Sequence, residues 1–107
     1  MQARPLAQKP NTRVQESPNG ECSVWLHGTE IVRANPDWIV LRTDGHWTVT
    51  TKRRMNEASK ALGLRFNVHS LCRVWRVTVW SPTGVWLAEH SFKGDGMRFN
   101  RHTGALG

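Results

Sequence analysis

The chain has 107 residues, a length typical of one domain built around one modest hydrophobic core. Lys and Arg number 15 against 8 Asp and Glu, so the net charge is +7. That excess excludes an acidic mimic of DNA and favours nucleic acid, an anionic membrane surface or an acidic protein as the partner. The alternative is that the charge only keeps a small protein in solution.

Neither export nor membrane insertion is indicated by the sequence. The N-terminal segment carries Arg4, Lys9 and Arg13 but no apolar core of a signal peptide. No apolar run approaches the ~20 residues that a membrane span needs. We therefore expect a cytoplasmic protein with no membrane partner.

The N-terminal segment is polar and rich in proline. Residues 1–20 contain almost nothing to bury, which predicts a disordered basic arm. The expected ordered unit is a single α+β domain over residues 21–100. Residues 101–107 form a polar tail that we expect to fray.

Short apolar segments rich in β-branched and aromatic residues predict strands on both sides of one helix. The segments that precede the helix are 22–26, 30–34 and 38–42. Those that follow it are 64–68, 74–80 and 85–90, with a further short edge strand at 97–99.

The spacing of apolar residues becomes helical over residues 48–62. The side chains that fall on one side of such a helix are Val49, Met55, Ala58 and Leu62. Thr48 or Thr50 can supply the N-cap oxygen, so the helix should start within 50–52. Gly63 stands where a left-handed residue commonly ends a helix.

The predicted order of elements is therefore β-β-β-α-β-β-β with short hairpin connections. One helix is available to cover an antiparallel sheet of four to six strands, which indicates an α+β two-layer sandwich. The six tryptophans are large enough to anchor so small a core, and we expect most of them to lie in it.

The predicted helix start is the best candidate for a binding site. Three consecutive cations are expected in its first turn, where each exposed positive charge opposes the helix dipole at a cost of roughly 0.3–1 kcal/mol. A phosphate or carboxylate from a partner would compensate that charge. The predicted nucleic-acid- or anion-binding residues are Thr48, Thr50, Thr51, Lys52, Arg53, Arg54, Asn56 and Lys60. The alternative is a threonine-capped helix whose basic face is only solvated.

A secondary basic patch is predicted at Arg65, Arg73 and Arg76. If Arg76 lies on the open face of the sheet, Thr78 and Trp80 share that face with it. Exposed aromatic side chains beside arginines can stack the bases of single-stranded nucleic acid. Against this, tryptophans in a small domain more often belong to the core.

The sequence contains no catalytic or metal-binding pattern. The five histidines are scattered, and no set of Cys and His has the spacing of a zinc site. There is no phosphate-binding glycine loop and no nucleophile elbow. We expect no enzymatic activity, no metal and no cofactor. Cys22 and Cys72 do not form a CxxC pair and are expected to be free, buried thiols.

The segment Gly45-His-Trp-Thr-Val-Thr-Thr-Lys-Arg-Arg-Met-Asn56 resembles a family of small proteins encoded mainly by tailed bacteriophages. The shared motif is Gly-x-Trp-Thr-x-Thr-Thr-Lys-x-Arg-x-Asn, and the resemblance extends over about residues 25–99. This chain departs from the family in having Asp44-Gly45-His46 in place of a double glycine, and in an apparent insertion at 70–73. The resemblance implies a phage protein that acts in the host bacterial cytoplasm, and it transfers no catalytic residue.

Two functions are favoured at this point, ahead of a third possibility, a virion or structural accessory protein. The first is a phage accessory protein that binds nucleic acid or a ribonucleoprotein through the basic helix face. The second is an anti-defence or host-takeover inhibitor that uses the same face to block the nucleic-acid-binding or acidic site of a host protein. The sequence is compatible with a monomer or a homodimer in either case.

Overall fold

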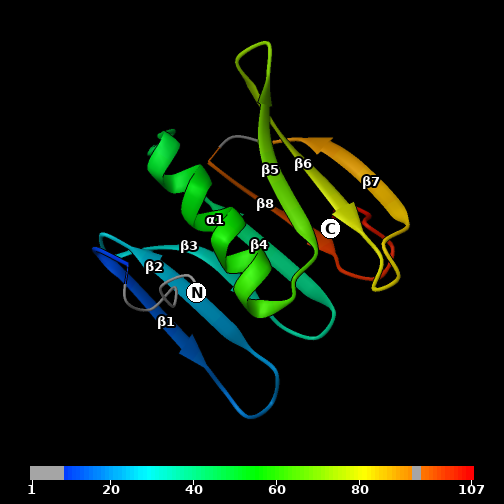
Figure 1. Cartoon of the computed structure of the whole chain (residues 1–107), viewed down its shortest axis with the longest axis horizontal. Coiled ribbons are helices and arrows are strands. Elements are labelled where there is room, and N and C mark those ends of the chain that lie inside the picture. Colours follow the sequence, from blue (N-terminus) through cyan, green and yellow to red (C-terminus); the bar gives the residue numbers. More distant parts are fainter. Residues whose placement is uncertain (1–8, 93–94) are drawn as a thin grey trace, which may run out of the picture.

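The computed structural model describes residues 9–92 and 95–107, which form eight strands and one helix (Figure 1). The first strands are β1 (Thr12–Glu16), β2 (Cys22–Leu26), β3 (Thr29–Ala34) and β4 (Trp38–Arg42). The helix α1 spans Val49–Leu62. The later strands are β5 (Phe66–Leu71), β6 (Val74–Trp80), β7 (Trp86–Ser91) and β8 (Gly96–Asn100). The predicted α+β class is confirmed.

The strands divide between two antiparallel sheets, whereas we expected one. The larger sheet has the order β1-β2-β3-β4-β8, and the smaller one has the order β5-β6-β7. Strand β8 returns to pair with β4, so that Trp38 lies opposite Asn100 and Ile39 opposite Phe99. The chain between β4 and β8 therefore forms α1 and the whole of the smaller sheet.

The two layers are the larger sheet and, on one of its faces, α1 together with the smaller sheet. Figure 1 shows α1 over β2 and β3, and β5 and β6 over β8. The rings of Phe66 in β5 and Phe99 in β8 meet edge to face, with centroids 6.1 Å apart. Fully buried side chains from both layers form one core cluster; examples are Val24, Ile31, Ile39, Leu41, Met55, Val77, Val79 and Phe99.

Side chains of α1 pair with the free edge of β5 in place of a neighbouring strand. The Asn56 amide donates to the Val68 carbonyl at 2.8 Å and accepts from the Val68 amide at 2.6 Å. One turn later, the buried Ser59 hydroxyl donates to the Phe66 carbonyl at 2.6 Å and accepts from the Phe66 amide at 2.9 Å. An edge strand otherwise leaves such backbone groups unpaired. These contacts fix the helix beside the smaller sheet.

The N-terminal segment differs from the expected disordered arm over residues 1–20. Strand β1 pairs with β2 along its full length, and Val14 packs against the core. The Arg13 guanidinium lies 4.3 Å from the centroid of the Trp25 ring, a cation–π contact. A strand with one apolar residue has little local signal, and its stability comes from pairing. The part of the expected arm at residues 1–8 lies outside the described residues.

The C-terminal segment is also more ordered than expected. Leu106 forms a β-bridge with Phe99, and the Asn100 side chain accepts hydrogen bonds from two following backbone amides at 2.8 and 3.0 Å. Gly104 is buried with a φ of 78°, and a Cβ added there would lie 2.7 Å from the Ala88 Cβ. This close approach holds the tail against β7, although no apolar periodicity in the sequence indicates it.

Within residues 9–92 and 95–107, no helix is long and apolar enough to cross a membrane.

Candidate functional site

The start of α1 is set by Thr48, one of the two predicted N-caps. Its Oγ1 accepts a hydrogen bond from the Thr51 amide at 3.1 Å. The helix therefore begins at Val49, ahead of the expected start within 50–52. Val49 is also 65% exposed, so its predicted place on the core side of the helix is wrong.

The three consecutive cations lie further from the helix terminus than we predicted. Lys52 is the fourth residue of α1, and Arg53 and Arg54 belong to its second turn. The dipole effect falls off within the first turn. The electrostatic conflict between these cations and the helix dipole is therefore smaller than the sequence implies.

The predicted threonines and the predicted cations face different hollows. Thr48, Thr50 and Thr51 line a cavity of about 330 Å³ together with His27 and His46. Thr51 is buried, and its hydroxyl lies 3.1 Å from that of Thr48. Thr48 therefore caps the helix start and Thr51 packs beneath it, and the basic residues form a separate site.

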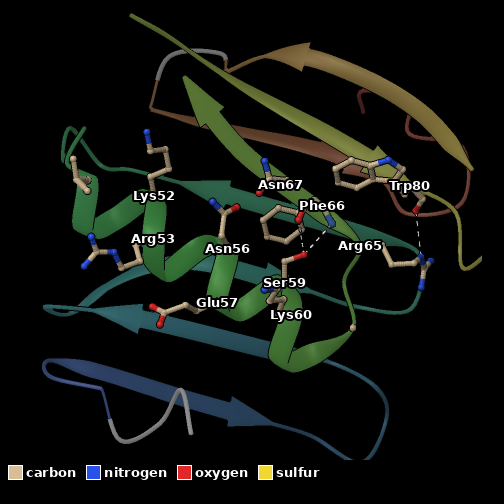
Figure 2. Close-up of a pocket in the computed structure, with 12 residues that line it drawn as sticks. Lys52, Arg53, Asn56, Glu57, Ser59, Lys60, Arg65, Phe66, Asn67 and Trp80 are labelled. Atoms are coloured by element: carbon tan, nitrogen blue, oxygen red, sulfur yellow. Dashed lines mark hydrogen bonds between the residues drawn. The ribbon is translucent and has the colours of Figure 1, made fainter. Parts of the chain in front are cut away.

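That separate site is a groove between α1 and the edge of the smaller sheet, with a volume of about 690 Å³ (Figure 2). We call it the α1–β5 groove. One wall is the side of α1, where residues three or four apart share a face. The other wall comes from the segment around β5 and from the end of β6. Its lining residues are Val49, Lys52, Arg53, Asn56, Glu57, Ser59, Lys60, Gly63, Arg65, Phe66, Asn67 and Trp80.

Four cations line the α1–β5 groove, and they differ in how far they are engaged. Lys52 Nζ donates to Ser70 Oγ at 3.0 Å and lies 5.8 Å from the centroid of the Trp75 ring. Arg65 Nε donates to the Trp80 carbonyl at 3.2 Å. Arg53 and Lys60 are exposed and form no ion pair with any carboxylate in the described part of the chain.

Arg54 and Asn56, both predicted to bind an anion, are engaged within the protein. Arg54 Nη1 lies 2.7 Å from Glu57 Oε1, and its Nε donates to the Thr12 hydroxyl at 3.2 Å. The Arg54 side chain is 11% exposed. Asn56 uses both ends of its amide to pair with Val68. These two residues join α1 to its neighbouring strands.

Glu57 is an acidic residue in the lining of an otherwise basic groove. Burial raises the pKa of its carboxyl, but hydrogen bonds from Arg54 and Lys9 outweigh that effect and leave the pKa below its ordinary value. Lys9 Nζ lies 3.2 Å from Glu57 Oε2. Because two cations already hold the Glu57 carboxylate, it offsets little of the positive charge of Arg53 and Lys60.

The three arginines of the predicted secondary patch lie apart. Arg65 precedes β5 and lines the groove, whereas Arg73 lies in the turn at the far end of β5 with a φ of 66°. A strand of this length separates them by about 20 Å. Arg76 is on β6, where its Nε lies 2.6 Å from Glu89 Oε2. It shares a polar network with Thr78, which donates to Glu89 at 3.2 Å.

We expected most of the tryptophans to lie in the core, but none of the six is among the buried residues. Trp25 lies under Arg13, and Trp38 lies under Arg98 at 4.5 Å. Trp47 and Trp75 meet edge to face beside Phe92. Aliphatic side chains and phenylalanines fill the core instead, and the indoles lie on its margins.

The indoles of Trp80 and Trp86 differ from the other four. Trp80 lines the α1–β5 groove, and Trp86 on β7 is its partner in the strand register. Trp86 is 60% exposed. No aromatic pair or cation–π contact covers either ring within the described residues.

Both cysteines are free, as expected, but the prediction of buried thiols is wrong for Cys72, which is exposed. Burial raises the pKa of the half-buried Cys22 thiol. In residues 9–92 and 95–107, no three His, Cys, Asp or Glu side chains gather as a metal ion would require.

Comparison with known proteins agrees with the resemblance to phage proteins. Neither a search of the curated proteins nor a search of the solved structures found a match. A family model described as Kyanoviridae Gp96 protein matches residues 1–99, which is most of the chain. The chain therefore belongs to the Kyanoviridae Gp96 protein family, a family of cyanophage proteins.

Proposed function

We propose that the protein is a non-enzymatic phage accessory protein that binds nucleic acid in the α1–β5 groove. The observation that carries this proposal is the groove itself, a basic hollow with an aromatic wall. In this proposal Lys52, Arg53, Lys60 and Arg65 contact phosphates. Such contacts supply affinity and position without reading sequence.

The spacing of the cations suits a phosphate backbone. Lys52 and Lys60 are two turns apart on α1, about 12 Å along its axis. They can therefore engage different phosphates of one strand, while Arg53 projects from the same wall (Figure 2). The net charge of +7 adds long-range attraction to any polyanion.

The salt dependence of binding tests this proposal. Each phosphate contact on a single strand contributes about −0.7 to the slope of log affinity against log salt, so four contacts predict a slope of about −3. Between about 50 mM and about 200 mM salt the affinity should then fall about 50-fold. Gel shift with mixed-sequence oligonucleotides measures this directly.

A charge-matched pair of variants separates the groove from general basicity. The groove variant carries Lys52→Gln, Arg53→Gln and Lys60→Gln, and we expect its slope to become shallower by about 2. The control variant removes three exposed arginines outside the groove: Arg33→Gln, Arg42→Gln and Arg73→Gln. An equal effect of both variants would mean that binding depends only on the net charge of the protein, and would contradict a site in the groove.

A host-protein target is the competing outcome. If the protein fails to bind oligonucleotides even at low salt, the nucleic-acid proposal is wrong. A host protein captured from lysate after nuclease treatment, and lost with the groove variant but not with the control variant, would favour the inhibitor function instead.

A further inference from the structure

We propose that the nucleic acid bound in the groove is single-stranded, and that its bases stack on Trp80 and Trp86. This inference rests on the proposed function, because the groove supplies the phosphate contacts that bring a strand to the two indoles. It goes further by naming the form of the nucleic acid and the surface that holds its bases.

The strand register places the two tryptophans together. Trp80 at the end of β6 lies opposite Trp86 at the start of β7. The register shifts at a β-bulge between Val79 and Trp80, and Trp86 is the residue that the shifted register sets opposite Trp80. The Arg65 guanidinium is held beside this pair by its hydrogen bond to the Trp80 carbonyl. Two indoles and an arginine therefore form one surface at the end of the groove, which we call the indole platform.

The exposure of Trp86 has no structural explanation within the described residues. The other indoles have partners: Trp25 and Trp38 lie under arginines, and Trp47 (42% exposed) and Trp75 contact aromatic rings. Trp86 leaves 60% of its surface in water, which forgoes most of the free energy that burial of an indole provides. A ligand with flat apolar faces would cover this surface, and nucleobases have such faces.

The shape of the groove favours a single strand over a duplex. The major groove of B-DNA admits a helix that protrudes from its protein. The basic side of α1 does not protrude, because Asn56 and Ser59 bind it to β5 and the sheet forms a wall beside it. A strand lying in this recess has its phosphates along α1 and its bases toward the platform. Paired bases are stacked inside a duplex and cannot turn onto indoles.

The connection between groove and platform is continuous. Trp80 lines the groove at the end where Arg65 lies, and Figure 2 shows both on the strand wall opposite Lys60. The strand can therefore pass from the cations of α1 onto the indoles without leaving the protein surface. Attraction between phosphates and cations holds the strand along α1, and stacking of its bases holds it on the indoles.

The test measures the affinity of the full chain for a mixed-sequence single strand and for a duplex of the same length at one salt concentration. We expect the wild-type protein to prefer the single strand. Trp86→Ala should weaken single-strand binding about 5- to 150-fold, the range for loss of one base–aromatic stack. It should leave duplex affinity and the salt slope unchanged, because the cations remain.

Two further variants control for packing. Val85→Ala shortens a neighbouring side chain that is 59% exposed, and we expect no loss of affinity. Trp86→Phe retains an aromatic face and should recover part of the binding that Trp86→Ala loses. Circular dichroism of each variant shows whether the fold is intact.

The outcomes separate this inference from the proposed function. If the groove variant lacks binding while Trp86→Ala binds the single strand normally, base stacking on the indole platform is wrong and phosphate binding in the groove is supported. Equal wild-type affinity for single strand and duplex also overturns the inference. Absence of all binding at low salt overturns both proposals.

Discussion

Asn56 shows how a residue's role can change between sequence and structure. Because Asn56 lies among the cations and hydroxyls of residues 48–60, the sequence predicts that it binds an anion. In the structure its amide instead forms hydrogen bonds with the backbone at the edge of β5. An amide has donors and an acceptor and can match both backbone groups of one residue. The neighbouring Ser59 does the same with one hydroxyl. Local sequence carries no sign of this pairing, because β5 follows only after the helix ends.

We expect Asn56→Ala to lower stability and to leave the affinity of the folded protein for nucleic acid unchanged. Removing the amide leaves the Val68 backbone groups without partners, which costs about 1–3 kcal/mol when such groups are buried. Urea unfolding measures the loss. Asn67→Ala is the control, because Asn67 lines the same groove but forms no side-chain hydrogen bond within the described residues. Similar losses for the two variants would contradict the pairing role of Asn56.

The lowered pKa of the Glu57 carboxyl predicts that the stability of the protein depends on pH. The folded-state pKa of this carboxyl lies below the ordinary value of 4.5, so its stabilising contribution is present above pH 4.5 and is lost as pH falls through the folded-state pKa. The contribution should be at most about 1 kcal/mol, because the ion pair is partly solvated. Urea unfolding of wild type and Glu57→Gln at about pH 6 and about pH 3 tests this. The variant should differ from wild type more at the higher pH, and the opposite order would contradict the assignment.

At the scale of elements, α1 combines features that the sequence predicts with one that it does not. Gly63 has a φ of 66° and ends the helix as its position indicates. The basic residues lie together along one side, as helical spacing requires. The strand wall that turns this side into a groove could not be predicted, because it depends on which edge of which sheet lies beside α1.

The N-cap hydrogen bond distinguishes the threonine that stabilises α1 from a neighbouring threonine that does not. Thr48→Ala removes the acceptor for the Thr51 amide, and we expect a loss of about 0.5–2 kcal/mol with no change in the salt slope of binding. Thr50→Ala is the matched control, since Thr50 is exposed and does not cap the helix. Thermal or urea unfolding compares the two. A larger effect of the control would show that the capping assignment is wrong.

Strand prediction succeeded where apolar alternation was dense and failed where it was sparse. Residues 22–26, 38–42 and 74–80 are strands with the predicted bounds. Strand β1 was missed because Val14 is its single apolar residue, and its stability comes from pairing with β2. The exposure of Trp86 and its place beside the half-buried Trp80 could not be identified, because indole size predicts burial unless the sheet register is known.

At the scale of the whole molecule, pairing between distant segments decides the architecture. The antiparallel sheet expected from hairpin connections became two sheets because β8 pairs with β4 and not with β7. No local pattern specifies that choice. It leaves β5, β6 and β7 as a separate sheet beside α1, and this separation creates the groove.

The return of β8 to β4 has a consequence for the kinetics of folding. The β4–β8 pair encloses a long loop, and closing it loses much chain entropy before any contact repays the loss. The α1 helix and the β5–β6–β7 meander lie inside that loop and need only local contacts. We expect them to form first, with β8 docking last. Pulse-labelling hydrogen exchange during refolding should protect β6 amides before β8 amides, and the reverse order would contradict this sequence of events. Both walls of the groove would then exist as a folding intermediate before the larger sheet is complete.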